Sequence, residues 1–179
     1  MKRCEQETIV IGPRNIMVAT DFGEAASRAL QYGLEFARAF RATVHVVHVA
    51  DNLAASAAAA VGSPLIDLGA AQASVDDEAR RTLAALTTTD EIPALDVHPT
   101  LLCDHQPAKA LLSFAREKDA DLIIIGTHGR GGLAEFFLGS VAQRVVRSAP
   151  CPVLTVRAVE RDFVSPDTAK PAGASARLQ

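Results

Sequence analysis

The chain has 179 residues, of which 49% are hydrophobic and 22% charged, and its formal net charge is −3. That length suits one domain with a shared core, and the balance of residue types is that of an ordinary globular protein. The negative charge and the lack of a long Lys/Arg block disfavour nucleic acid as a partner.

Cysteine usage and hydropathy bear on the compartment. Cys4, Cys103 and Cys151 are odd in number and far apart, unlike the disulfide framework of a secreted protein. No run reaches the roughly 18 apolar residues of a membrane helix, and Glu5 and Glu7 lie where a signal peptide would have its apolar core. We therefore expect a cytoplasmic protein with no membrane partner.

Short β-branched segments recur along the chain and predict strands. They cover residues 15–20, 43–49, 95–103, 122–126 and 152–157. Within the fourth, Ile123–Ile124–Ile125 is apolar without alternation, as in a parallel sheet that is covered on both faces.

Helical patterns separate these strands. They cover residues 26–40, 75–86, 108–118 and 140–148, with apolar residues at the three-and-four spacing of an amphipathic helix. Strict alternation of strand and helix predicts an α/β fold, in which right-handed crossovers wind a single open parallel sheet with helices on both faces.

Two stretches depart from this alternation. Residues 51–74 are rich in Ala and contain Gly62, Ser63 and Pro64, so a partly helical insertion and a loop both remain open. Residues 158–179 lack any periodicity, and we expect a disordered tail. The predicted domain therefore covers residues 1–157.

A glycine-rich segment directly follows the fourth predicted strand. It runs Gly126-Thr127-His128-Gly129-Arg130-Gly131-Gly132, and Gly139-Ser140 opens the next helix. Glycines let a backbone approach a ligand, and the first helical turn has N–H groups without intrahelical acceptors, an arrangement that binds phosphate. The alternative is that Gly126 and Gly129 only turn the chain and Ser140 only caps the helix.

Two common phosphate motifs do not fit. A Walker A loop needs Lys after its glycines, whereas Leu133 follows Gly132,. The dinucleotide fingerprint needs glycines after the first strand, whereas that strand ends in Thr20-Asp21-Phe22-Gly23,. These observations disfavour a P-loop NTPase and a Rossmann dehydrogenase.

The spacing Gly126-x-x-Gly129, nine residues, Gly139-Ser140 resembles the nucleotide-binding signature of ATP-binding universal stress proteins. The flanking residues 15–21, 48–49 and 149–154 also resemble that family's first, second and fifth strands, so the resemblance spans about residues 14–157. It implies a Rossmann-like sheet of the adenine nucleotide alpha hydrolase type, in the order 3-2-1-4-5. ATP would lie across the carboxyl ends of strands one and four, where open α/β sheets bind ligands.

The resemblance also implies roles for individual residues. Ala19, Thr20 and Asp21 would border the nucleoside, and the backbone of Val49 would meet the adenine edge. The ribose and phosphates would contact Ile125, Gly126, His128, Gly129, Gly139, Ser140, Val141 and Ala142. The implied cofactor is ATP, or AMP or ADP, with Mg²⁺.

Some of these polar residues have purely structural interpretations. Asp21 with Glu24 three residues later resembles a capping box, which is compatible with a further contact to ribose or magnesium. His45 and His48 lie three apart on a predicted strand, so they point to opposite faces and no protein metal site is expected.

The predicted function is that of a stress-response protein whose nucleotide occupancy alters conformation or partners. Apart from Asp21 and His128, no general base is evident near the phosphate site, so fast turnover is not expected. Slow ATP hydrolysis and a scaffold of the same family without nucleotide remain as alternatives. The resemblance places residues 152–157 at a sheet edge, where the apolar run Val153-Leu154-Thr155-Val156 predicts a homodimer.

Overall fold

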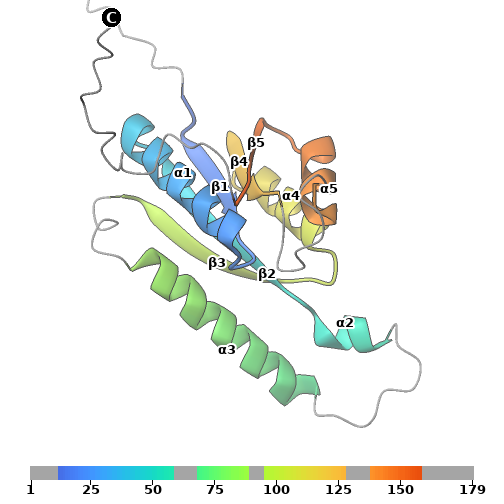
Figure 1. The fold of residues 1–179 in the computed structure, drawn as a ribbon. Helices are drawn as coiled ribbons and strands as arrows, with labels where there is room; N and C mark the ends of the chain where they lie inside the picture. Colours follow the sequence, from blue (N-terminus) through green and yellow to red (C-terminus); the bar gives the residue numbers. More distant parts are fainter. Residues whose placement is uncertain (1–11, 59–67, 89–94, 128–137, 159–179) are drawn as a thin grey trace, which may run out of the picture.

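The computed structural model describes residues 12–58, 68–88, 95–127 and 138–158 (Figure 1). Within these ranges the chain forms β1 (Asn15–Ala19), α1 (Glu24–Phe40), β2 (Thr43–Ala50), α2 (Leu53–Ala58), α3 (Leu68–Thr87), β3 (Val97–Cys103), α4 (Pro107–Glu117), β4 (Leu122–Gly126), α5 (Ser140–Ser148) and β5 (Val153–Val156). The expected alternation of strand and helix is confirmed.

The strands form one parallel sheet in the order β3-β2-β1-β4-β5, as predicted. β1 is central, and its last residue, Ala19, is in register with Val47 of β2 and Ile125 of β4. Because all strands run in the same direction, their carboxyl ends meet along one edge of the sheet. That edge positions the candidate site.

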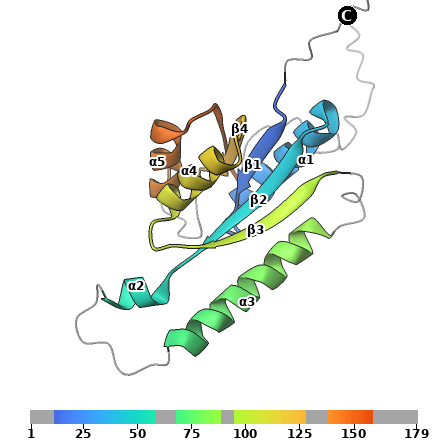
Figure 2. The same cartoon turned by 180° about the vertical axis from the view of Figure 1, so that it is seen from behind.

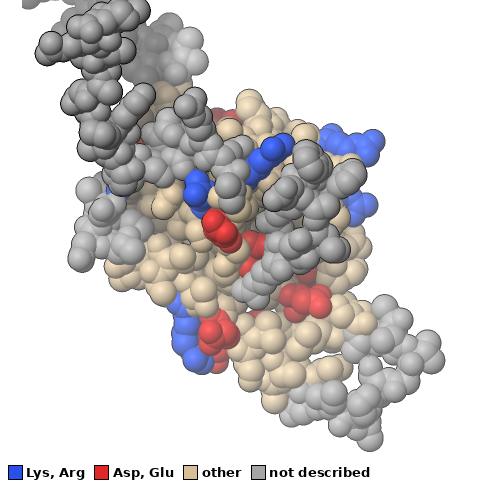
Figure 3. All heavy atoms as spheres, viewed as in Figure 1, with Lys and Arg blue, Asp and Glu red and all other residues tan. Residues whose placement is uncertain are grey.

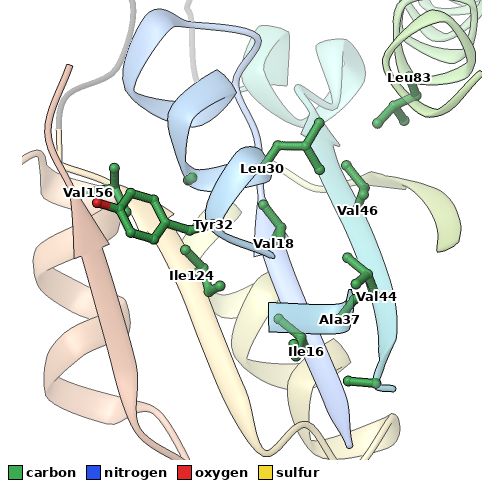
Figure 4. Close-up of a cluster of buried hydrophobic side chains, with 12 residues drawn as sticks. Ile16, Val18, Leu30, Tyr32, Ala37, Val44, Val46, Leu83, Ile124 and Val156 are labelled. Atoms are coloured by element: carbon green, nitrogen blue, oxygen red, sulfur yellow. The ribbon is translucent and has the colours of Figure 1, made fainter. Parts of the chain in front are cut away.

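Helices cover both faces of the sheet, as its apolar strands require. On one face Leu30 of α1 and Leu83 of α3 pack in a cluster with Val18 and Ile124 (Figure 4). On the other face α4 and α5 pack against Met17 and Ile123. Figures 1 and 2 show these two layers from opposite sides.

The described parts of the Ala-rich insertion over residues 51–74 are largely helical, in line with the partly helical alternative. α2 lies within it, and α3 begins at Leu68, earlier than the predicted start at residue 75. Gln72 of α3 joins the two helices: its Oε1 accepts from Leu53 N at 2.9 Å and its Nε2 donates to Asp51 O at 3.1 Å. Residues 59–67 and most of the predicted tail, 159–179, lie outside the described residues. None of the described helices is long and apolar enough to span a bilayer.

The two β2 histidines lie on opposite faces of the sheet, as the alternation predicted. His45 stacks on His98 with ring centroids 5.4 Å apart and meets the edge of Phe114 in α4. His48 instead contacts Phe22. Within the described ranges, no group of three or more His, Cys, Asp or Glu side chains is arranged to hold a metal ion.

The surroundings of His45 disfavour its charged form. Burial, together with the nearby His98 and Lys118, lowers the pKa of His45 below its usual 6.5, although Asp96 opposes the shift. Asp96 also accepts a 2.7 Å hydrogen bond from Thr43 Oγ1 and pairs with His98 Nε2 at 2.8 Å. The folded chain therefore resists protonation at His45 more than the unfolded chain does.

We expect this histidine to make stability pH-dependent. As the pH falls through 6.5, the unfolded state binds a proton at His45 before the folded state does, so the free energy of unfolding decreases. Urea melts at about pH 7.5 and 5.5 measure how much free energy of unfolding is lost over this interval. The loss should be smaller for His45→Gln than for the wild type. Equal losses for wild type and His45→Gln would contradict the prediction.

Candidate functional site

A crevice opens at the carboxyl ends of β1 and β4. Its volume is about 290 Å³, close to the lower end of the range for small-ligand cavities. Every residue that the sequence assigned to the site and that the structure describes lines this crevice: Ala19, Thr20, Asp21, Val49, Ile125, Gly126, Gly139, Ser140, Val141 and Ala142. His128 and Gly129 lie outside the described residues.

The crevice also has lining residues that the sequence did not single out. They are Ala26, Val47, His48, Pro107, Leu111 and Thr127. Val47 could have been found, because it lies two residues before Val49 on the same face of β2. No local sequence pattern placed Pro107 and Leu111 in the site, because only the packing of α4 against the sheet brings them to this edge. With Val47 and Val49 they make much of the wall apolar.

One wall is the beginning of α5. Its first intrahelical hydrogen bond runs from Gln143 N to Gly139 O at 2.8 Å. The amides of Ser140, Val141 and Ala142 therefore have no acceptor within the helix. Gly139 is the N-cap and has no side-chain cap. Ser140 is the first helical residue, so the interpretation of Ser140 as a cap is wrong. The positive end of the helix dipole therefore faces the crevice.

Gly139 is held against the end of β4 by a backbone bond. Its N–H donates to Thr127 O at 2.7 Å, while Thr127 N donates to Val156 O in β5 at 2.8 Å. The φ of Gly139 is −57°, which any residue adopts, so this position does not require positive φ. A Cβ on Gly139 would instead lie 3.2 Å from Thr127 O. The constraint at Gly139 is close approach.

Gly126 has a structural explanation. A Cβ at this position would lie 3.0 Å from the backbone of both Ala25 and Ala26 in α1, and real Cβ atoms are rarely so near a main chain. Gly126 lets α1 approach the end of β4, and it lines the crevice as well. The structural and the binding interpretations of this residue are therefore compatible.

The turn between β1 and α1 forms the opposite wall. Phe22 N donates to Thr20 Oγ1 and Gly23 N to Asp21 Oδ1, each at 3.0 Å. Phe22 has a φ of 65°, a left-handed conformation that costs a residue with a side chain about 1–3 kcal/mol. α1 begins only at Glu24, with Gly23 as its N-cap.

The predicted capping box is therefore wrong. The Asp21 carboxylate accepts from the amide two residues later, which makes an Asx turn. With Gly23 at the N-cap, Glu24 is the first helical residue and not the third. The positive φ at Phe22 lengthens the turn and moves the helix start beyond the reach of Asp21. Asp21 lines the crevice instead.

His48 contacts this turn from the neighbouring strand. Its Nδ1 lies 2.8 Å from Thr20 O, and because a carbonyl only accepts, Nδ1 carries the hydrogen. Its ring centroid lies 4.2 Å from that of Phe22. His48 thus contacts the residues on both sides of Asp21.

The polar groups of the described lining are main-chain amides, hydroxyls, one carboxylate and one imidazole. Asp21 and His48 are its titratable side chains, and it contains no Lys or Arg. An anion would therefore be held by the main-chain amides of α5, and a metal ion or hydroxyl groups by Asp21. The described lining does not pair a nucleophile with an orienting base.

Comparison with known proteins gives a consistent result. The model of the universal stress protein family matches residues 12–157. A universal stress protein of Methanocaldococcus jannaschii is 31% identical over 155 residues, which cover 83% of this chain and 85% of that protein. A universal stress protein from Thermus aquaticus is 33% identical over 144 residues, which cover 80% of this chain and 98% of that protein.

Solved structures agree in fold. A member of the same family from Burkholderia pseudomallei is 31% identical with a TM-score of 0.62, covering 79% of this chain and 94% of that one. The universal stress protein from Archaeoglobus fulgidus in complex with dAMP is 27% identical with a TM-score of 0.57. The match covers 80% of this chain and 97% of that one.

Proposed function

This chain belongs to the universal stress protein family, and from that membership we propose that its crevice binds an adenine nucleotide, ATP or its mono- or diphosphate, with Mg²⁺. One observation carries the proposal: the unpaired first turn of α5 opens into a cavity at the carboxyl ends of β1 and β4. The relative from Archaeoglobus fulgidus was solved with dAMP, which supports the ligand class.

The energetics of this site are sufficient for micromolar affinity. A hydrogen bond to a charged group contributes about 1.5–3 kcal/mol, and micromolar affinity corresponds to about −8 kcal/mol. The amides of Ser140, Val141 and Ala142 would supply roughly half to all of that gross energy. Val49, Pro107 and Leu111 offer an apolar wall on which a base can pack. Under the resemblance, His128 and Gly129 would add contacts to ribose and phosphate.

We propose that occupancy, and not rapid turnover, is the functional event, so that bound nucleotide alters conformation or partners. The described lining offers Asp21 as its carboxylate and no second one to activate water,. Steady-state hydrolysis should therefore stay far below the common enzyme range of about 1–10³ s⁻¹. A rate within that range that disappears in Asp21→Asn would show that the chain is an enzyme.

Gly139→Val should weaken nucleotide binding at least about a hundredfold, through loss of two or more charged hydrogen bonds. The new Cβ would lie 3.2 Å from Thr127 O, so the neighbouring backbone has to give by a few tenths of an ångström. The β-branched side chain would also stand beside the amides of Ser140 and Val141 and push the phosphates away from them. Calorimetric titration with Mg-ATP measures the effect, and thermal melts check the fold.

Gln143→Val is the matched control, because it places the same side chain on the exposed face of the same helix. It should bind like the wild type. Equal binding by Gly139→Val and wild type would mean that the α5 amides do not hold phosphate. A wild type that binds neither ATP nor AMP would favour the scaffold alternative.

We further propose that β5 pairs with its copy in a homodimer. β5 is an edge strand of the sheet, and Val153, Leu154 and Thr155 remain half-buried. Pro152 O accepts a hydrogen bond from Ile123 N in β4, and Val156 O accepts one from Thr127 N, directly after β4. Since alternate residues of a strand direct their backbone groups to opposite sides, Val153 and Thr155 present theirs to the open edge.

Thr155→Pro should convert the dimer into a monomer. Proline removes the outward N–H but no bond to β4, and an edge strand tolerates it. Light scattering at about tens of micromolar, a range in which specific dimers are populated, measures the mass. Thr155→Val, which keeps the N–H, should remain dimeric. A monomeric wild type, or a dimeric Thr155→Pro, would overturn the assignment of this edge.

A further inference from the structure

The direction of the Asp21 carboxylate depends on a turn that does not favour its own conformation. Phe22, the next residue, has a φ of 65°, which L side chains rarely adopt. Two hydrogen bonds within the turn, to Thr20 Oγ1 and Asp21 Oδ1, support it. Both join residues only two positions apart, so they form and break with the turn itself.

His48 supplies contacts from outside the turn. It belongs to β2, which the sheet holds in register with β1 through pairs such as Ala19 and Val47. From there Nδ1 donates to Thr20 O at 2.8 Å and the imidazole lies against the Phe22 ring at 4.2 Å. These contacts add to the backbone bond from Thr20 N to Val47 O at 2.9 Å, and they hold the main chain before Asp21 and the side chain after it.

We propose that His48 is a positioning residue of the crevice, which clamps Thr20 and Phe22 so that the Asp21 carboxylate stays directed at the nucleoside. This role rests on the proposed nucleotide binding. His48 acts through the turn, and its contribution reaches the ligand by way of Asp21. Sequence patterns assigned His48 no role in the crevice: it counted as one of two histidines on a strand and as part of the stretch that resembles the family's second strand.

Substitutions at His48 separate its hydrogen bond from its bulk. His48→Leu keeps an apolar side chain but removes the donor, and we expect AMP affinity to fall about three- to tenfold, the effect of one neutral hydrogen bond. His48→Asn places an amide nitrogen near the position of Nδ1 but lacks the ring, so it should recover only part of the affinity that His48→Leu loses. Phe22→Leu, which loses only the ring contact, should give an intermediate loss.

His98→Leu is the matched control. His98 lies on β3 and is half-exposed, outside the crevice lining, so its loss should leave AMP affinity unchanged. Thermal melts of every variant identify any that fail to fold. Equal affinity of His48→Leu and wild type, or no rescue by His48→Asn, would overturn the clamp.

A double-mutant cycle tests the route through Asp21. Asp21→Asn keeps the Oδ1 acceptor for Gly23 N but removes the charge. If His48 acts through the carboxylate, adding His48→Leu to Asp21→Asn should cost less than about twofold in AMP affinity, well under its effect alone. Additive losses would mean that His48 contacts the ligand independently and would overturn the positioning role.

Hydrogen exchange in the ligand-free protein distinguishes failure of the clamp from failure of the proposed function. His48→Leu should accelerate exchange at the amides of Phe22 and Gly23 at least about threefold, because the turn opens more often. His48→Asn, which keeps a donor but loses the ring, should accelerate it less, and His98→Leu should leave it unchanged. If the wild type binds no AMP, the proposed function fails, and this exchange still decides whether the clamp exists. Unchanged exchange in His48→Leu would overturn it.

Discussion

The parallel pairing of β1 with β4 is the constraint on which the crevice depends. Ile16 to Ala19 lie in register with Leu122 to Ile125, and most of these side chains are fully buried, each contributing about 1.5–3 kcal/mol,. After β1 the chain enters α1 on one face, and α5 packs on the other. Since the two helices lie on opposite faces, neither fills the edge between the strands, and a hollow results from the topology alone.

Thr127 ties this hollow to the beginning of α5. Its N–H is bonded to β5 and its carbonyl to Gly139 N, so one residue joins β4, the edge strand β5 and the start of α5. Ala142 and Val145 bury the inner face of that helix. The direction of the α5 amides is therefore set by the sheet and the core. A change in β5, such as pairing with a second copy, acts on the same residue.

The sequence predicted the sheet order and the membership of the crevice, because strand alternation and glycine spacing are local signals that a family resemblance could extend. It failed where two local signals competed. Asp21 and Glu24 have capping-box spacing, but the left-handed Phe22 moves the helix start to Glu24. It also missed Pro107 and Leu111, which reach the crevice only through the packing of α4 against the sheet.

The two walls of the crevice differ in what maintains them. The α5 wall offers main-chain amides, which do not titrate and whose positions follow from buried apolar contacts, so the proposed phosphate contacts would depend little on side-chain identity beyond Gly139. The β1 wall offers a carboxylate on a turn that carries backbone strain, and its geometry relies on contacts from β2. The backbone strain at Phe22, about 1–3 kcal/mol, is comparable to the stabilisation that the hydrogen bond and ring contact of His48 supply. The wall at the end of β1 is therefore the part of the crevice whose geometry depends most on individual side chains, in particular on His48 and Phe22.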